Sequence, residues 1–199
     1  MVSMTSTRHH DVVADARAAA ETVTDPELPM LTLADLGVLR DVDVVDGRVI
    51  VSITPTYTGC PAMDTMRDDL VRTLHEAGYD DVEVRTVLHP PWSTDWISEE
   101  GKRKLAEAGI APPGAAPSPQ QGPVPLTLEP APSPMIMNTS GPMWSESVHD
   151  HGRGGGSAVR CPQCGSPDTE EVSRFSATAC KALRRCRSCT EPFEHVKEI

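Results

Sequence analysis

The feature of this 199-residue chain that most limits its fold is a pair of C-x-x-C motifs near the C-terminus. Cys161 and Cys164 form the first motif, and Cys186 and Cys189 form the second after 21 intervening residues. Two such motifs place four thiolates tetrahedrally around one metal ion, and Zn²⁺ suits a set of four thiolates. The sequence therefore predicts a zinc ribbon over residues 158–199.

The small size of this segment favours a structural role for the metal. Its 42 residues hold few large apolar side chains, so metal binding would supply most of its folding free energy. A rubredoxin-like iron site and two disulfides are the alternatives, and a reducing compartment disfavours disulfides. Cys180 is left over as a possible extra thiol. It could be a fifth ligand, a redox thiol or a buried structural residue, and burial is the default for a lone cysteine.

The middle of the chain differs in composition from both ends. Ten of the 19 prolines lie between positions 112 and 142, and residues 111–157 contain only four charged residues before a Gly-rich close. Such a composition buries too little apolar surface to offset chain entropy. We predict a Pro/Gly-rich linker over 111–157, in which MIM at 135–137 and MW at 143–144 form an apolar exception.

The net charge of the chain limits the kinds of partner that it can bind. With 18 Lys and Arg against 29 Asp and Glu, the net charge of −11 opposes a general electrostatic grip on nucleic acid or anionic lipid. The ribbon has a small basic cluster around Arg184 and Arg185, but it lacks the aromatic residues that stack bases. No apolar run reaches the roughly 20 residues of a membrane helix, and the polar N-terminus lacks a secretory signal. We expect a cytoplasmic protein without nucleic-acid or membrane partners.

Residues 1–110 are predicted to form a small α+β domain in the order α-β-β-α-β-α. Apolar residues recur at helical spacing from Val12 to Val23. Alternating valines on either side of Asp46 and Gly47 indicate a β-hairpin with a type I′ turn. A second helix should follow Pro61, a third strand is suggested over 82–88, and a last helix over 98–108.

A cysteine between the second strand and the second helix is the candidate reactive thiol of this domain. Pro61 is favoured at the first helical position, which would place Cys60 at the N-cap, where the helix dipole favours a thiolate. From spacing alone, a functional and a structural Cys60 remain equally open. Asp25, Glu27 and Asp35 lie in loops that could approach Cys60, although acidic residues are also ordinary turn formers.

Four segments together resemble the SufT-like iron–sulfur assembly proteins. They are TDPELP at 24–29, DLG at 35–37, PTYTGCP at 55–61 and PPWSTDWI at 90–97. The ribbon, with Phe175 and TACKAL at 178–183, narrows the resemblance to the D subunits of phenylacetyl-CoA epoxidase, also called phenylacetate-CoA oxygenase. The resemblance implies an accessory protein of aerobic phenylacetate degradation, more in keeping with a non-catalytic subunit than with an enzyme. Its implied partners are the iron–sulfur reductase or the di-iron oxygenase subunit.

Three functions are compatible with these residues. In the first, which we favour, the chain helps mature the iron–sulfur or di-iron centres of the epoxidase. Cys60 then transiently holds iron or a cluster, and Asp25, Glu27 and Asp35 line or shape the site. In the second, the chain is a structural or regulatory oxygenase subunit with an inert Cys60. In the third, it is a thiol-redox protein that uses Cys60 with Cys180.

Overall fold

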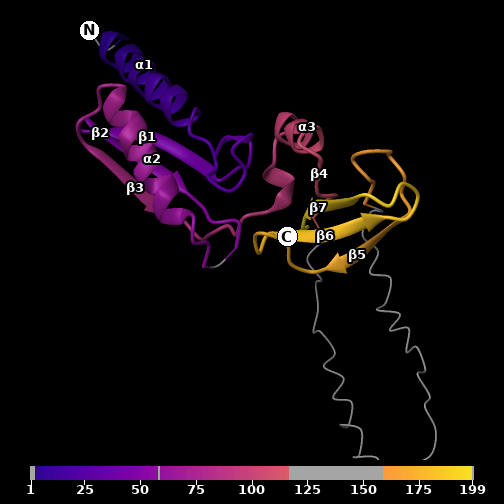
Figure 1. Ribbon diagram of the computed structural model, residues 1–199. Coiled ribbons are helices and arrows are strands. Elements are labelled where there is room, and N and C mark those ends of the chain that lie inside the picture. Colours follow the sequence, from indigo (N-terminus) through magenta and orange to yellow (C-terminus); the bar gives the residue numbers. More distant parts are fainter. Residues whose placement is uncertain (1–2, 58, 117–158, 199) are drawn as a thin grey trace, which may run out of the picture. The chain divides into compact units, whose positions relative to one another are not determined.

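A computed structural model describes residues 3–57, 59–116 and 159–198 (Figure 1). Residues 1–116 and 157–199 belong to one compact unit. The predicted linker lies outside the described residues from position 117 onward, and so do its apolar residues at 135–137 and 143–144. Within the described ranges, no helix is both long enough and apolar enough to cross a membrane.

The first part of the chain is an α+β domain, as predicted, and its main elements follow the expected order. They are α1 (Ser3–Ala20), β1 (Leu39–Val45), β2 (Arg48–Ile53), α2 (Met63–Glu76), β3 (Val82–Thr86), the short 3₁₀ helix η1 (Thr94–Trp96) and α3 (Glu99–Glu107). Strand β3 ends before Leu88, which the sequence had suggested as its last apolar residue and which is exposed.

The three strands form one sheet in the order β1-β2-β3, with β1 antiparallel and β3 parallel to β2. Asp46 and Gly47 both have positive φ, at 52° and 86°, as a type I′ turn requires. The predicted hairpin is therefore confirmed. Alternate residues of β2 are buried, namely Val49, Val51 and Ile53, and α1 and α2 contact the sheet and each other.

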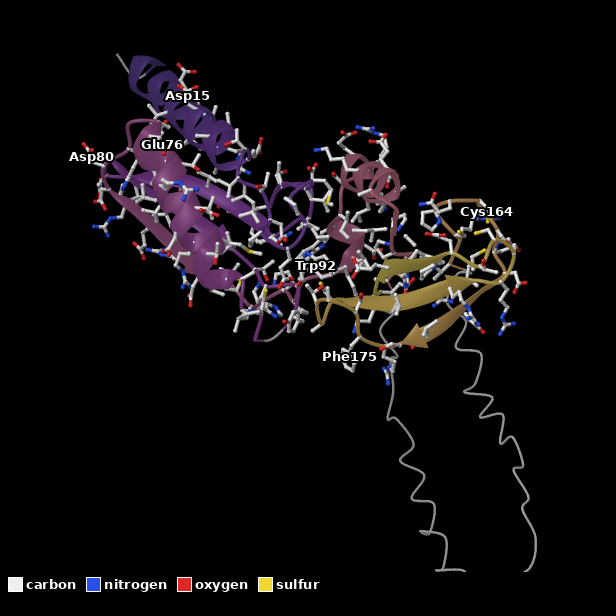
Figure 2. All side chains as sticks on the ribbon, viewed as in Figure 1. Asp15, Glu76, Asp80, Trp92, Cys164 and Phe175 are labelled. Carbon is white, nitrogen blue, oxygen red and sulfur yellow. The ribbon has the colours of Figure 1, made fainter. Side chains whose placement is uncertain are left out.

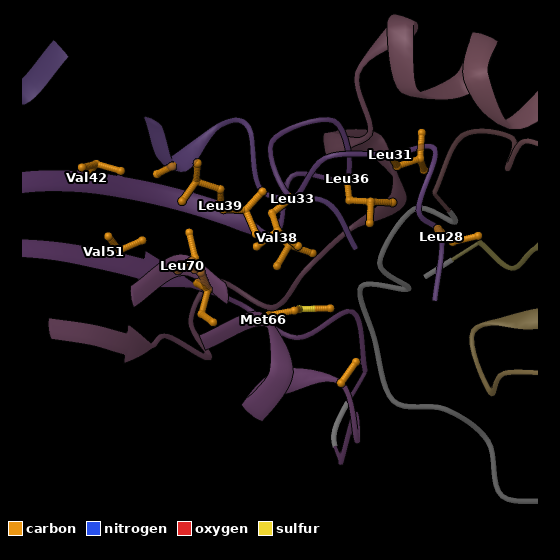
Figure 3. Packing of buried hydrophobic residues seen from close by; sticks show 14 of the residues in the cluster. Leu28, Leu31, Leu33, Leu36, Val38, Leu39, Val42, Val51, Met66 and Leu70 are labelled. Atoms are coloured by element: carbon orange, nitrogen blue, oxygen red, sulfur yellow. The ribbon is translucent and has the colours of Figure 1, made fainter. Parts of the chain in front are cut away.

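Helix α2 supplies the main helical face of the core. Met66, Leu70 and Leu74 are buried at intervals of four residues, and Figure 3 shows Met66 and Leu70 among the leucines and valines of the same cluster. The helix ends before Gly78, whose φ of +95° lies in the left-handed region that favours glycine. Both the stripe and its end were predictable from the sequence.

The C-terminal part forms a second sheet that also takes in residues from the first part. Its strands are β5 (Thr169–Ser173), β6 (Lys181–Cys186) and β7 (Pro192–Val196), joined by β4 (Ile110–Ala111) in the order β4-β7-β6-β5. Strand β4 pairs in parallel with β7, with Ile110 opposite Glu194 and Ala111 opposite His195. Ala111, which the sequence assigned to the linker, thus lies in the ribbon's sheet.

The packing continues this connection between the first part and the ribbon. Val196, at the end of β7, is buried in the same hydrophobic cluster as Leu28, Leu36 and Trp92. The backbone N–H of Gly114 also donates to the Glu198 carboxylate at 3.1 Å. The ribbon and the first domain consequently share a core in addition to their sheet pairing.

Candidate metal-handling sites

The four ribbon cysteines lie close together, as the paired motifs predicted (Figure 2 labels Cys164). Their sulfur atoms all lie within 4.8 Å of one another, with 3.7 Å from Cys161 to Cys189 and 3.6 Å from Cys164 to Cys186. Zinc–sulfur bonds of about 2.3 Å in a tetrahedron give sulfur separations of about 3.8 Å. The four side chains therefore fit a tetrahedral thiolate site, and all are free thiols, in contrast to the disulfide alternative.

The ribbon thiols do not ionise as equals. The backbone N–H groups of Cys189 and Ser188 donate toward Cys186 and help lower its pKa to about 6. At Cys189 the N–H of Glu191 also lowers the pKa. Desolvation and hydrogen bonds with neighbouring thiols act against it and raise the pKa to about 12. One thiolate thus makes the next harder to form, and a bound cation removes this obstacle.

Cys60 lies in the loop between β2 and α2, and its predicted position at the N-cap is wrong. Pro61 and Ala62 form a turn, so that Ala62 is the N-cap and the helix begins at Met63. Burial raises the pKa of the Cys60 thiol and outweighs the opposing hydrogen bond from the Ala62 N–H, so the thiolate is not favoured here.

A small cavity lies beside Cys60. Its volume is about 20 Å³, and its ionisable lining comprises Cys60, Asp25, Glu27, Cys180 and Lys197. The apolar wall includes Leu28, Leu36, Met66, Trp92 and Val196. The structure therefore places two thiols and a pair of neighbouring carboxylates, from three separate parts of the sequence, around one cavity.

The loop that carries Asp25 and Glu27 is held in place by hydrogen bonds between its own residues. The Oδ1 atom of Asp25 accepts the backbone N–H groups of Glu27 at 2.8 Å and Leu28 at 2.7 Å. Asp25 is only 5% exposed, and its own N–H donates to the carbonyl of Leu31 at 2.9 Å. Among the residues that the structure describes, none donates a hydrogen bond to Asp25 Oδ2. The carboxylate of Asp25 therefore fixes the turn of its own loop.

Four ionisable groups of this cavity have pKa values above their usual range. At Asp25 burial is the main cause, and the N–H groups of Leu28 and Glu27 oppose it. At Glu27 burial is again first, and the charge of Asp25 adds to it. Burial also raises the pKa values of Cys60 and Cys180, and the charge of Glu27 raises both further. Burial therefore disfavours the charged forms of these four groups, and the positive charge of Lys181 opposes this effect at Asp25, Glu27 and Cys180.

Asp35 is not among the residues that line this cavity. Its Oδ2 accepts from Lys104 Nζ at 2.7 Å and from the Thr32 N–H at 3.1 Å, while Ser98 donates to Oδ1 at 3.2 Å. Burial acts to raise the pKa of Asp35, but the bonds with Lys104 and Thr32 together lower it. The geometry supports a structural role for Asp35, which ties the loop before β1 to α3.

This ion pair gives a stability prediction. A Lys104→Met variant should lose about 1–3 kcal/mol of unfolding free energy at pH 7, since it leaves a half-buried carboxylate without its charged donor. The lowered pKa of Asp35 means that the contribution is present above about pH 4 and is lost as the pH falls through that lowered value. Urea unfolding at pH 7 and at decreasing pH values measures both effects.

Lys102→Met is the matched control for this prediction. Lys102 lies on the same helix and pairs with Glu99 at 2.8 Å, but the carboxylate of Glu99 is 90% exposed. Its loss should change the unfolding free energy by less than about 1 kcal/mol. If both variants lowered the unfolding free energy equally, the Asp35–Lys104 pair would stabilise the protein no more than an exposed ion pair does.

Two families match the two parts of the chain. The family described as "Iron-sulfur cluster assembly protein" matches residues 13–86, and the family described as "PaaD zinc beta ribbon domain" matches residues 145–197. The fold, the four ribbon cysteines and these two matches define the class of protein. It consists of an iron–sulfur assembly domain joined to a zinc ribbon domain.

A match over most of the chain narrows this class to one family. The chain is 34% identical over 177 residues to the putative D subunit of the 1,2-phenylacetyl-CoA epoxidase of Escherichia coli, and the match covers 89% of this chain and 87% of that protein. The chain belongs to the family of these epoxidase D subunits, and the resemblance seen in the sequence is confirmed.

Shorter matches cover half of the chain or less. The "Fe-S protein maturation auxiliary factor" of Porphyromonas gingivalis is 37% identical over 86 residues, which cover 42% of this chain and 81% of that protein. The crystal structure of a domain of unknown function from Bacillus anthracis is 27% identical, with a TM-score of 0.47, and covers 50% of this chain and 96% of that chain.

Proposed function

We propose that this chain is a maturation factor of a phenylacetyl-CoA epoxidase system, in which Cys60 transiently holds the iron, or the iron–sulfur cluster, destined for a partner subunit. Asp25 and Glu27 assist Cys60 at the cavity, and the ribbon cysteines hold a structural zinc ion. The recipient is the iron–sulfur reductase or the di-iron oxygenase subunit. The protein itself carries out no catalytic reaction.

The observation that carries this proposal is the composition of the cavity. A thiol and two carboxylates meet at one small space that is walled by apolar side chains. Thiolate and carboxylate are both ligands of iron. The named role of the relatives in Fe-S protein maturation, together with the subunit name of the E. coli relative, supports the same function.

The first test removes the thiol of Cys60. A Cys60→Ser variant keeps nearly the same volume but replaces a soft, ionisable ligand with a hydroxyl. We expect the unfolding free energy to change by about 1 kcal/mol, while delivery of iron to the partner subunits is lost. The measurements are the iron content and activity of the epoxidase, and growth on phenylacetate, in strains that carry each variant.

Leu74→Ala controls for a loss of stability. Leu74 is fully buried on α2 and is not part of the cavity lining, so its truncation should cost about 2–5 kcal/mol and leave the ligands in place. The strain should still contain iron-loaded epoxidase whenever the variant protein persists. A fully iron-loaded epoxidase in the Cys60→Ser strain would contradict the proposal.

A second experiment separates a maturation factor from a structural subunit. Epoxidase subunits whose metal centres are already filled should work without this chain if it acts only during assembly. A structural or regulatory subunit would be required at every turnover. Activity of the purified, metal-loaded subunits, measured with and without added chain, decides between the two.

A further inference from the structure

Strand β3 forms one edge of the sheet in the first domain. The sheet has the order β1-β2-β3, and Figure 1 shows β3 at its outer margin. We propose that this edge pairs with the β3 edge of a second copy of the chain, antiparallel and around a two-fold axis at Val84. The sheets of the two copies would then join into one continuous sheet.

The backbone of β3 has hydrogen-bonding groups on both sides. On the inner side, the Val87 N–H donates to the Ile53 carbonyl at 2.8 Å. The Asp81 carbonyl accepts the Val49 N–H at 2.9 Å on the same side. Because backbone groups of successive residues point to opposite sides of a strand, those of the even-numbered residues from 82 to 86 point away from β2. No backbone group of the described residues bonds to this outer side, so another strand can add there.

The side chains of β3 are complementary to a reversed copy of the same strand. In an antiparallel pair centred on Val84, Glu83 lies opposite the partner's Arg85. Val82 lies opposite the partner's Thr86, and the two copies of Val84 face each other. Positions 83 and 85 form the non-hydrogen-bonded pairs, whose Cα atoms are only about 4.5 Å apart. The interface therefore has two directly opposed pairs of opposite charge, which stabilise a strand pair.

The two charged side chains of β3 are exposed on the face of the sheet that is opposite the buried one. Val84 is in register with the buried Val51, so its neighbours at 83 and 85 point to the other face. Arg85 Nε donates to Glu83 Oε1 at 2.7 Å, and the two side chains are 53% and 38% exposed. This hydrogen bond is the main cause that lowers the pKa of Glu83, and the charge of Arg48 adds to it. Both charges are thus present at neutral pH and accessible to a second copy.

The outer strands β1 and β5 lack this complementarity. A reversed copy of β1 centred on Val42 would place Asp41 opposite the partner's Asp43. Asp43 Oδ1 also accepts the Val44 N–H at 2.8 Å, and a bulge interrupts the start of β1. A reversed copy of β5 centred on Glu171 would oppose two carboxylates, and β5 is also bulged. Since like charges directly opposite are destabilising, self-pairing is favoured at β3 over β1 and β5.

The pairing fixes how the two Cys60 loops are arranged in the dimer. Strands β2 and β3 are parallel, so reversing β3 in the second copy also reverses β2, after which the Cys60 loop follows. The two loops would lie at opposite ends of the joined sheet, and each copy would keep its own cavity.

Charge exchange at positions 83 and 85 tests this register. The zinc-loaded full chain is studied by analytical ultracentrifugation at about 0.15 M salt, where the Debye length is about 8 Å and distant charges are screened. We expect a wild-type dimer with a Kd below about 1 mM. Arg85→Glu opposes carboxylates and Glu83→Arg opposes guanidinium groups, so each should weaken dimerisation by more than about tenfold. An equimolar mixture of the two variants should form a heterodimer, because every opposed pair again has opposite charges.

Arg103→Glu is the matched control for Arg85→Glu. Arg103 lies on α3, and its side chain is 55% exposed, close to the 53% of Arg85. The substitution changes the net charge by the same amount but leaves β3 intact. This variant should dimerise as the wild-type chain does.

Amide hydrogen exchange locates the interface within the dimer. The amides of Val82, Val84 and Thr86 should exchange more slowly as the chain concentration rises, because only the dimer provides acceptors for them. A wild-type chain that stays monomeric up to about 1 mM would overturn the proposal. So would an undiminished dimer in Arg85→Glu, a mixture that fails to restore dimerisation, or a dimer in which these amides are not protected.

Discussion

A Cys161→Ser variant should lose its zinc ion and its folded ribbon together. Among the described residues, a second, smaller core consists of Ala111, Cys161, Cys186 and Phe193, so two of its four buried residues are predicted metal ligands. Structural zinc contributes on the order of 10 kcal/mol to the folding of zinc-finger peptides at neutral pH. A core of this size cannot replace that contribution.

Cys180→Ser is the matched control for this prediction. It replaces a cysteine of the same ribbon that lies outside the two motifs, and it should retain one zinc ion per chain. Metal analysis and the dispersion of amide signals from β5, β6 and β7 measure the two variants. A ribbon that stays folded in Cys161→Ser, or in the wild-type chain under strong chelation, would contradict the structural role of the metal.

A Gly37→Ala variant should be strongly destabilised. Gly37 has a φ of +67°, and a Cβ atom there would lie 2.6 Å from the Trp96 Cβ and 2.8 Å from the Trp96 carbonyl oxygen. Left-handed backbone costs about 1–2 kcal/mol for a residue with a side chain, and overpacking adds about 1–3 kcal/mol. We expect a loss of about 2–5 kcal/mol in the unfolding free energy, measured in urea.

Gly47→Ala separates the cost of the left-handed backbone from the cost of overpacking. Gly47 also has positive φ, at +86°, but a Cβ there would meet nothing within 4 Å. This variant should therefore show only the backbone cost. If the two variants were equally unstable, close packing against Trp96 would not be the reason that glycine is needed at position 37.

Local signals in the sequence were sufficient for most of the fold. The spacing of Met66, Leu70 and Leu74 predicted α2, and Asp46 with Gly47 predicted the hairpin, because each pattern depends on neighbours within a few residues. The grouping of the four ribbon cysteines was equally clear, because the spacing of paired C-x-x-C motifs is the one that a tetrahedral metal site requires.

Contacts between residues that lie far apart in the sequence could not be predicted in this way. The pairing of Ile110 with Glu194 joins residues 84 apart, and a two-residue strand has no periodicity that a sequence pattern can reveal. The presence of Cys60 and Cys180 in the lining of one cavity has the same origin. The helix start after Cys60 was misjudged because Pro61 also suits a turn, and here Ala62 rather than Cys60 is the N-cap.

The burial of Val196 in the core of the first domain has a consequence for synthesis on the ribosome. Val196 follows Ala111, the last residue of β4, by 85 residues. At about 5–20 residues per second, it is added roughly 4–17 s after the rest of that core. During this interval the newly made domain lacks the valine that packs against Leu28, Leu36 and Trp92. The final packing of this domain therefore has to wait until the ribbon has been made and has left the ribosome.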